Sequence, residues 1–414
     1  MKKNFFPLIC IPLLFTPCVY AVDLGHGFSL KGFGTAGMVA NTDDQADYVA
    51  NHAFQNYGAG RSDQVTYQVD TRFGMQMDWQ ALDRLSFTAQ AITKQYEDKT
   101  WEPRLEWGYA KVKLLDNVDV RAGQIRPAIY MLSDYLDINY ANPWVRPPSD
   151  FYSAASITHM TGIDFLWRPK TGPVTWLVQP YFGESNVKLV GGSNLDAENI
   201  AGINLTANYQ DFTFRFGFVN YVLTLHSNDF DTTLIPALQG LCLTIDPVAC
   251  QAISDFGLKN AESSFGSIGV TWDNGDYFIT SEAGRRNSTS RTVSALTSWY
   301  ISGGARFNEF TPYVTFSSSK SEDNTVYTSG SVYTNQIITA LLANGGQNQS
   351  TFTLGVRYDF YENFALKFQW DRIDTQTRGG QAGTGKGLFI NPTTEFGNSP
   401  NTVDLLSTSI DFVF

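Results

Sequence analysis

The stretch Phe212-Thr-Phe-Arg-Phe-Gly-Phe218 alternates aromatic residues with small or polar ones at every step. Successive side chains of a β-strand point to opposite faces, so this pattern predicts a strand with one aromatic face and one polar face. The polar face includes the ionised side chain of Arg215. Such a strand is typical of a transmembrane β-barrel, where the aromatic face meets lipid and the polar face meets a water-filled lumen.

The same alternation recurs elsewhere in the chain. It is clearest in four further runs: Val65 to Trp79, Phe352 to Phe360, Phe364 to Trp370 and Leu406 to Phe414. We expect the first of these to be one long strand, with Val69 toward lipid and Asp70 and Arg72 toward the lumen. Repetition of one pattern over the whole chain predicts an all-β fold, a transmembrane antiparallel barrel.

The N-terminal segment has the features of a secretory signal peptide. Lys2 and Lys3 precede an apolar run from Phe5 to Phe15, and Val19-Tyr20-Ala21 offers residues that a signal peptidase reads. We expect residues 1–21 to be the signal peptide, and residues 22–414 to form a single barrel domain.

Charge and hydropathy exclude several classes of protein. The chain has 29 Lys and Arg against 40 Asp and Glu, a formal charge of −11 that becomes −13 without Lys2 and Lys3. This acidic balance argues against nucleic acid as a partner. Beyond the N-terminal segment, no stretch approaches the roughly 20 apolar residues that a transmembrane helix needs. A closed β-barrel is the other structure that can span a membrane.

The connections between the expected strands alternate in length. Tight turns fall at Gln80–Arg84, Asp116–Asn117, Lys170–Pro173, Gln210–Asp211, Asn274–Asp276, Asn308–Glu309 and Tyr361–Asn363. Longer segments span Val39–Gln64, Glu97–Pro103, Pro127–Ser156, Glu184–Glu198, Thr224–Ser263, Asn287–Ser294, Lys320–Gln349 and Thr375–Thr402. Seven turns and eight loops join 16 strands, with both termini on the short-turn, periplasmic side and the long loops outside the cell.

The third long loop, Pro127 to Ser156, is too long for a hairpin connection. It follows the strand Val118 to Gln124 and combines charged residues with many aromatic ones. Long loops without regular structure are usually functional or disordered, and one this aromatic is unsuited to disorder. We therefore expect it to fold into the barrel lumen.

The last expected strand ends the protein on Phe412-Val413-Phe414. Together with the signal peptide, the alternating strands and the long third loop, this ending resembles the Gram-negative outer-membrane porins. The resemblance implies a homotrimer in the cell outer membrane, in contact with lipid and lipopolysaccharide. It also implies that Phe412 and Phe414 belong to the assembly signal read by the barrel-insertion machinery.

In porins that this chain resembles, basic residues of early strands face acidic residues of the inward loop. A transverse field of this kind sieves solutes by size and charge together. The candidate pore constriction here consists of Arg72, Arg121, Arg126, Asp134, Asp137, Arg146 and Asp150. Lys111 and Lys113 on the fourth strand are further lumen candidates.

Four aromatic residues of the inward loop are further candidates: Tyr130, Tyr135, Tyr140 and Trp144. Their rings could stack against the apolar faces of sugars, or they could pack the loop against the barrel wall. The sequence favours packing but leaves both open.

Cys242 and Cys250 are the only cysteines after the N-terminal segment, and both lie in the fifth loop. In an oxidising compartment we expect a disulfide between them, with two free thiols as the alternative. Leu234 to Leu241 and Asp255 to Lys259 could form short helices in the same loop.

These features predict a channel for passive diffusion of ions and small hydrophilic solutes, and no enzyme. A porin selective for sugars or organic anions is the alternative, while an adhesin, a receptor barrel or a barrel enzyme fits less well. His26, His52, His159 and His226 show no metal-ligand spacing, and no Gly-x-Ser-x-Gly motif occurs. We expect no metal and no cofactor.

Overall fold

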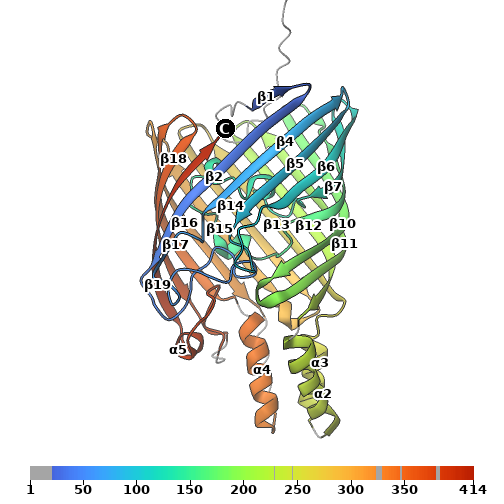
Figure 1. The fold of residues 1–414 in the computed structure, drawn as a ribbon, viewed down its shortest axis with the longest axis vertical. Helices are drawn as coiled ribbons and strands as arrows, with labels where there is room; N and C mark the ends of the chain where they lie inside the picture. Colours follow the sequence, from blue (N-terminus) through green and yellow to red (C-terminus); the bar gives the residue numbers. More distant parts are fainter. Residues whose placement is uncertain (1–20, 228, 245, 323–328, 346, 379–382) are drawn as a thin grey trace, which may run out of the picture.

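The computed structural model describes residues 21–414 apart from 228, 245, 323–328, 346 and 379–382. The expected signal peptide lies outside these residues except for Ala21. Over the described part, 16 long antiparallel strands form one closed barrel, because the last strand, β19, pairs with the first, β2 (Figure 1). The predicted fold class is confirmed.

The strands of the wall follow one another around the barrel in chain order. They are β2 (Phe28–Asn41), β4 (Arg72–Leu82), β5 (Leu85–Lys94), β6 (Arg104–Leu115), β7 (Val118–Ile125), β8 (Met160–Trp167), β10 (Val174–Leu189), β11 (Ser193–Tyr209), β12 (Phe212–His226), β13 (Ala261–Asp273), β14 (Tyr277–Ser288), β15 (Leu296–Ala305), β16 (Phe310–Ser321), β17 (Gln349–Tyr361), β18 (Phe364–Thr375) and β19 (Asn401–Val413). Three short strands pair at their ends: β1 (Val22–Gly25), β3 (Val65–Thr66) and β9 (Lys170–Thr171).

Helical segments occur in the loops. They are η1 (Ser133–Tyr135), η2 (Asn139–Ala141), α1 (Ser149–Tyr152), η3 (Val190–Gly192), η4 (Asp229–Leu234), α2 (Ile235–Thr244), α3 (Pro247–Phe256), η5 (Arg291–Val293), α4 (Val332–Gly345) and α5 (Thr394–Asn398). The helix expected over Asp255 to Lys259 is wrong, since α3 has ended at Phe256 and begins earlier, where Asp246 caps its first turn and Pro247 fits its first position. Among the described residues, no helix has both the length and the apolar character that a membrane crossing requires.

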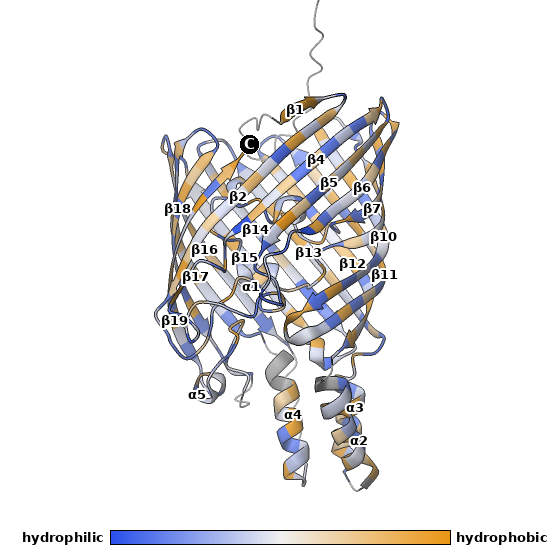
Figure 2. Cartoon of the chain, in the orientation of Figure 1, coloured by the Kyte–Doolittle hydropathy of each residue, from blue (hydrophilic) through white to orange (hydrophobic). Residues whose placement is uncertain are grey.

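The expected inside–outside alternation is present in the wall (Figure 2). In β12, Phe212, Phe214 and Phe216 are exposed on the outer face, whereas Arg215 between them is buried on the inner face. The outer surface of the wall is therefore apolar and the inner surface is polar, as a barrel in lipid requires.

The connections also alternate as expected. The short turns lie at the end that carries the C-terminus, and the long loops lie at the opposite end, where α2, α3 and α4 project beyond the wall (Figure 1). The strand β1 lies at the short-turn end with the C-terminus.

Two expectations about strand boundaries are wrong. The run from Val65 to Trp79 is not one strand, because the chain leaves the sheet after β3 and re-enters it at Arg72. Val69 consequently points inward and is buried, while its carbonyl accepts a hydrogen bond from Gln55. The period of two cannot show such a break when the residues on both sides keep the same alternation.

The second wrong boundary is the loop expected over Glu184 to Glu198. These residues continue β10 and β11 as a hairpin paired from Ser185–Ala197 to Leu189–Ser193, with only η3 as its turn. Its inner face carries the buried apolar residues Val187, Leu195 and Ala197 and its outer face is polar, the reverse of the alternation expected for the wall.

Candidate functional site

The third loop, residues 126–159, folds into the barrel as expected. Residues of η2 and α1, together with Ala128, Ile129, Met131, Trp144 and Arg146, are hydrogen-bonded to side chains of the wall strands from β12 to β19. Trp144 and Phe151 are fully enclosed. The loop therefore packs against the far wall of the barrel.

Four basic side chains of the wall donate hydrogen bonds to carbonyl groups of this loop. Arg215 donates to Ala128 at 2.5 Å and Arg286 to Ala154 at 2.7 Å. Further round the barrel, Arg357 donates to the carbonyls of Tyr140 and Asn142, and Lys367 to those of Asn139 and Trp144. These contacts help to satisfy backbone acceptors that the packing of the loop buries.

Lys367 also forms an ion pair with Asp411 of β19 at 2.7 Å, and neither side chain has exposed surface. Thr35 of β2 donates to the same carboxylate at 2.6 Å. A buried charge pair needs such additional hydrogen bonds to offset its desolvation. The Lys367–Asp411 pair thus connects the inward loop to β19 and β2, the two strands that meet where the barrel closes, and we call this meeting the seam.

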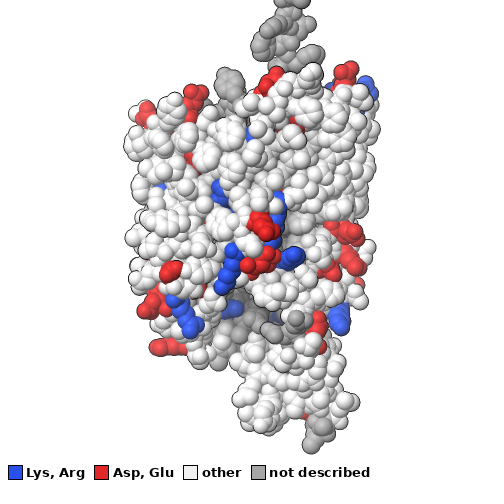
Figure 3. Space-filling model, viewed as in Figure 1, with Lys and Arg blue, Asp and Glu red and all other residues white. Residues whose placement is uncertain are grey.

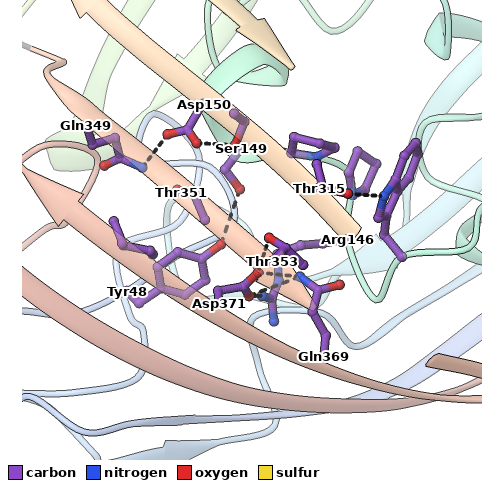
Figure 4. Close-up of a pocket in the computed structure, with 15 residues that line it drawn as sticks. Tyr48, Arg146, Ser149, Asp150, Thr315, Gln349, Thr351, Thr353, Gln369 and Asp371 are labelled. Atoms are coloured by element: carbon purple, nitrogen blue, oxygen red, sulfur yellow. Dashed lines mark hydrogen bonds and ion pairs between the residues drawn. The ribbon is translucent and has the colours of Figure 1, made fainter. Parts of the chain in front are cut away.

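The tip of the loop lies along β16, β17 and β18 (Figure 4). Arg146 pairs with Asp70 at 2.6 Å and with Asp371 at 3.1 Å, and Asp150 accepts a hydrogen bond from Gln349 at 2.6 Å and another from Ser317. Burial raises the pKa of Asp150, although its hydrogen bonds act in the opposite direction. About 360 Å³ of space, part of it open to solvent, remains between the tip and these strands.

On the opposite side, one carboxylate of the loop faces β4, β5 and β6, which we call the early strands. Asp137 lies 3.1 Å from Arg72, 3.0 Å from Lys94 and 2.6 Å from Arg126. Glu106 of β6 shares two of these cations, at 3.1 Å from Arg126 and 3.8 Å from Lys94. Burial acts to raise the pKa of Asp137, but Lys94, Arg126 and Arg72 outweigh it and hold that pKa well below its usual range.

A cavity of about 1360 Å³, part of it open to solvent, lies beside this cluster. It is bordered by the ends of β4 to β6, the segment 50–55, the inward loop and the end of β10. Figure 3 shows basic and acidic side chains gathered at mid-height on this side of the molecule. We call this space the early-strand cavity.

The structure brings only some of the predicted constriction residues together. Arg72, Arg126 and Asp137 meet in one cluster. Arg121 instead pairs with Asp164 of β8, with Nε to Oδ1 at 2.9 Å. Asp134 is exposed, and Lys113 pairs with Asp116 at the short-turn end. Lys111 is half-buried on β6 and does not line the cavity.

Arg146 and Asp150 lie at the loop tip near β16 to β19. Arg146 also pairs with Asp70, just before β4, and borders the early-strand cavity, whereas the place expected for Asp150 in a field facing the early strands is wrong. Both side chains serve to attach the loop to the wall.

The loop aromatics use their rings in packing. Tyr130 meets Phe151 and Phe265 in edge-to-face contacts, each with 5.5 Å between ring centroids. Tyr140 lies under Arg357, and Trp144 donates to Ser302 and Thr315 at 3.1 and 3.0 Å. Tyr135 is half-buried against the same apolar core. These contacts fit the packing interpretation and not the sugar track.

Sequence reasoning missed Lys94 and Glu106. Alternation counted back from Lys111 places Glu106 on the outer face, but a register shift opposite Gln90 and Ala91 turns it inward. A bulge of this kind reverses the facing of every residue beyond it. Lys94 is the last residue of β5 and pairs across the sheet with Arg72, so both side chains face the lumen. Counting the alternation of β5 as far as Lys94 could have identified it from the sequence.

Two further site expectations concern metal and disulfide chemistry. In the part of the chain that the structure describes, no group of His, Cys, Asp and Glu could hold a metal ion. Cys242 of α2 and Cys250 of α3 are joined by a disulfide, with 4.9 Å between their Cα atoms. The bond closes the turn between the two helices.

The sequence matches no protein-family model, and no curated protein matches it. Solved structures do resemble the barrel. OmpT of Vibrio cholerae in its trimer form has a TM-score of 0.54 at 9% identity, covering 94% of this chain and 100% of that one. The outer membrane channel DcaP of Acinetobacter baumannii has a TM-score of 0.54 at 11% identity, covering 94% and 98%.

OmpF of Salmonella typhi, in complex with daunomycin, likewise has a TM-score of 0.54, at 12% identity and with 94% and 97% of the two chains covered. At such low identity the likeness concerns the architecture alone. The 16-stranded barrel described here has the fold of the outer-membrane porins.

Proposed function

We propose that this protein is an outer-membrane channel through which ions and small hydrophilic solutes diffuse passively. The observation that carries the proposal is the position of the third loop. It is attached to the far wall by side chains of β12 to β19, and the early-strand cavity lies between it and the early strands. A loop fixed in this way narrows the bore on one side and leaves a charged passage on the other.

The location follows from the outer face. Large apolar side chains cover the outside of the wall in β12, β14 and β16, for example Phe214, Ile279 and Phe316. The solved relatives in fold are outer-membrane proteins, and one is described as a channel. With residues 1–21 as a signal peptide, the chain would be secreted, inserted by the barrel-insertion machinery and surrounded by lipid and lipopolysaccharide.

The early-strand face supports a homotrimer. Here β7 and β8 have 8 residues each, whereas β10 and β11 have 16 and 17. The loop after β5 exposes Asp98, whose side chain is 45% exposed. Figure 3 shows charged groups gathered at mid-height on this side of the molecule. Charges facing lipid are costly, so contact with further copies of the chain would cover this face. Native mass measurement in mild detergent showing only monomer would remove this part of the proposal.

The test of channel function is a planar-bilayer recording of the purified protein. We expect stepwise conductance increments in 1 M KCl, and no increments from the same preparation after heat denaturation. Folded protein that inserts without conducting would contradict the proposal and would favour a receptor or adhesin that uses α2 to α4.

An enzymatic barrel is the other class to be considered. The buried acidic residues nearest the loop are already engaged: Glu282 accepts from Met131 and the two tyrosines Tyr152 and Tyr300, and Asp164 pairs with Arg121. Such groups act as anchors for the loop and wall. We therefore propose no catalytic role for them.

A further inference from the structure

The lining of the early-strand cavity has an excess of positive charge. Six basic side chains, Arg72, Lys94, Arg104, Arg126, Arg146 and Lys188, face three acidic ones, Glu97, Glu106 and Asp137. Arg146 is balanced from behind by Asp70 and Asp371. Arg104 also pairs with Asp98, which lies outside the lining. With Asp98 counted, the other five bases exceed the acids by one, although the whole chain carries a net charge of −11.

The acidic groups of this lining are withdrawn from solvent. Asp137, Glu106 and Glu97 have side-chain exposures of 8%, 8% and 6%, and each accepts from a neighbouring base. Lys94 is 24% exposed, Arg104 is 31% exposed, and Lys188 lies on the surface of the cavity. A solute that enters the cavity therefore meets ammonium and guanidinium groups before it meets any carboxylate.

The lining also has an apolar part. Phe54, Val187 and three residues of the inward loop, Ile129, Leu136 and Ile157, border the same space. Removing apolar surface of a solute from water against such side chains favours binding. The cavity thus combines an apolar wall with exposed cations.

Sugar-like solutes fit this lining less well. The face of Tyr96 is covered by Arg104, whose guanidinium carbon lies 3.8 Å from the ring centroid. The rings of Tyr130 and Tyr152 pack against each other and against Phe151. Among the described residues, these aromatic faces are occupied by protein groups and are not available for stacking.

We propose that the early-strand cavity is a binding site for small amphipathic organic anions, such as aromatic carboxylates. The carboxylate pairs with Lys94 and Lys188, and the ring lies against the apolar lining. The proposal rests on the cavity being part of the permeation route proposed above, and it names the solute class that this route favours. Charge-assisted hydrogen bonds supply the selection for the anion.

Binding can be measured apart from conduction, by isothermal titration calorimetry of the detergent-solubilised full-length protein. The probes are benzoate, acetate and benzyl alcohol, which separate the charge of the ligand from its apolar body. We expect benzoate to bind at least about tenfold more tightly than either of the other two. Equal affinity for benzyl alcohol, or no heat from benzoate, would overturn the inference.

The variants Lys188→Gln and Lys94→Gln test whether these two lysines bind the carboxylate of the ligand. Lys188→Gln leaves the ion-pair cluster around Asp137 intact, so its folding is secure even if Lys94→Gln assembles poorly. Each is expected to weaken benzoate binding about tenfold. Lys170→Gln, the same change in a short turn outside the cavity, should leave it unaltered. Parental benzoate affinity in folded Lys188→Gln would rule out the proposed pairing.

Conductance is recorded on the same protein as a separate readout. A protein that conducts but does not prefer benzoate refutes the solute class and leaves the channel standing. Conversely, benzoate binding without conductance refutes the channel but supports the binding site.

Discussion

Arg126 donates a hydrogen bond to Asp137, with 2.6 Å between Nη2 and Oδ2, and so joins the first residue of the inward loop to its middle. Arg72 and Lys94 bring the adjacent early strands to the same carboxylate. The far side of the loop is held differently, through carbonyl groups that accept from Arg215, Arg286, Arg357 and Lys367. Asp137 is consequently the main ionic link between the loop and the early strands.

Replacing Asp137 with Asn should shift the ion selectivity toward anions, because three cations lose their shared carboxylate and a nearby solute meets their full charge. The reversal potential under a KCl gradient measures this shift. Asp134→Asn, at an exposed position of the same loop, is the matched control and should give a smaller shift. Equal shifts in the two variants would mean that the cluster does not set the local charge.

The selectivity should be independent of pH from 7 down to about 4.5. Neighbouring cations hold the pKa of Asp137 well below its usual range, so the carboxylate stays ionised over this interval. A lowered folded-state pKa gives stability that is present above the unfolded value, about 3.9, and is lost as the pH falls through the folded value. Reversal potentials that titrate with a midpoint between pH 5 and 6 would contradict this assignment.

Replacing Asp411 with Asn should destabilise the barrel by roughly 3–5 kcal/mol, because Lys367 keeps a buried charge without its partner. The change is measured by urea unfolding in detergent. The double variant Lys367→Met and Asp411→Leu removes both charges and should regain part of this loss. If Asp411→Asn unfolds like the parent, the pair does not stabilise the seam.

The double variant also separates the stability of the barrel from the mobility of the inward loop. Without Lys367 the carbonyls of Trp144 and Asn139 each lose a donor, although Asn139 still accepts from the backbone amide of Asn142, so the loop should become more mobile while the barrel remains folded. Increased current noise in single-channel records is the expected sign. Records as quiet as those of the parent would show that the other anchors suffice.

The C-terminal residue should matter for assembly in two separable ways. The backbone of Phe414 exchanges two hydrogen bonds with Gly32, at 2.8 and 2.9 Å, and its ring covers Gly32 so closely that an added Cβ would lie 2.1 Å from Cζ. Phe414→Ser keeps the backbone bonds and loses the ring, whereas deletion of Phe414 removes both and exposes the strand edge. We expect both to lower the outer-membrane yield, deletion more strongly.

Gly32→Ala tests the ring contact from the other side, because it displaces the Phe414 ring without changing the C-terminus. Gly303→Ala is its control, since the nearest atom there is an ordinary 3.5 Å away. Heat-modifiable migration and yield are the readouts. The ring contact is unimportant if Gly32→Ala assembles as fully as Gly303→Ala.

The architecture could be predicted from the sequence because each wall strand repeats one local rule. The facing of residues such as Phe214 and Arg215 can be inferred from their neighbours in the sequence alone. The rule fails at breaks and bulges, as at Val69 and Glu106, where one additional or unpaired residue reverses the facing without changing the residue types.

The partners within the lumen could not be predicted for a different reason. The alternation in their strands places Arg357 and Lys367 on the lumen face, but their hydrogen bonds go to loop carbonyls that no residue type identifies. Asp137 and Asp150 are both aspartates of the same loop, yet Asp137 faces three cations whereas Asp150 faces Ser317 and Gln349. Their heights and directions depend on the fold of the whole loop.

The most direct test of the channel account is the conductance of a variant lacking residues Tyr135 to Pro147, recorded in 1 M KCl beside the parent. This deletion removes Asp137, Trp144 and Arg146, and with them the part of the loop between the early-strand cavity and the far wall. Because that segment narrows the bore, the account predicts a clearly higher single-channel conductance in a barrel that keeps its heat-modifiable migration. A folded deletion variant with the parental conductance would show that the loop is not the constriction.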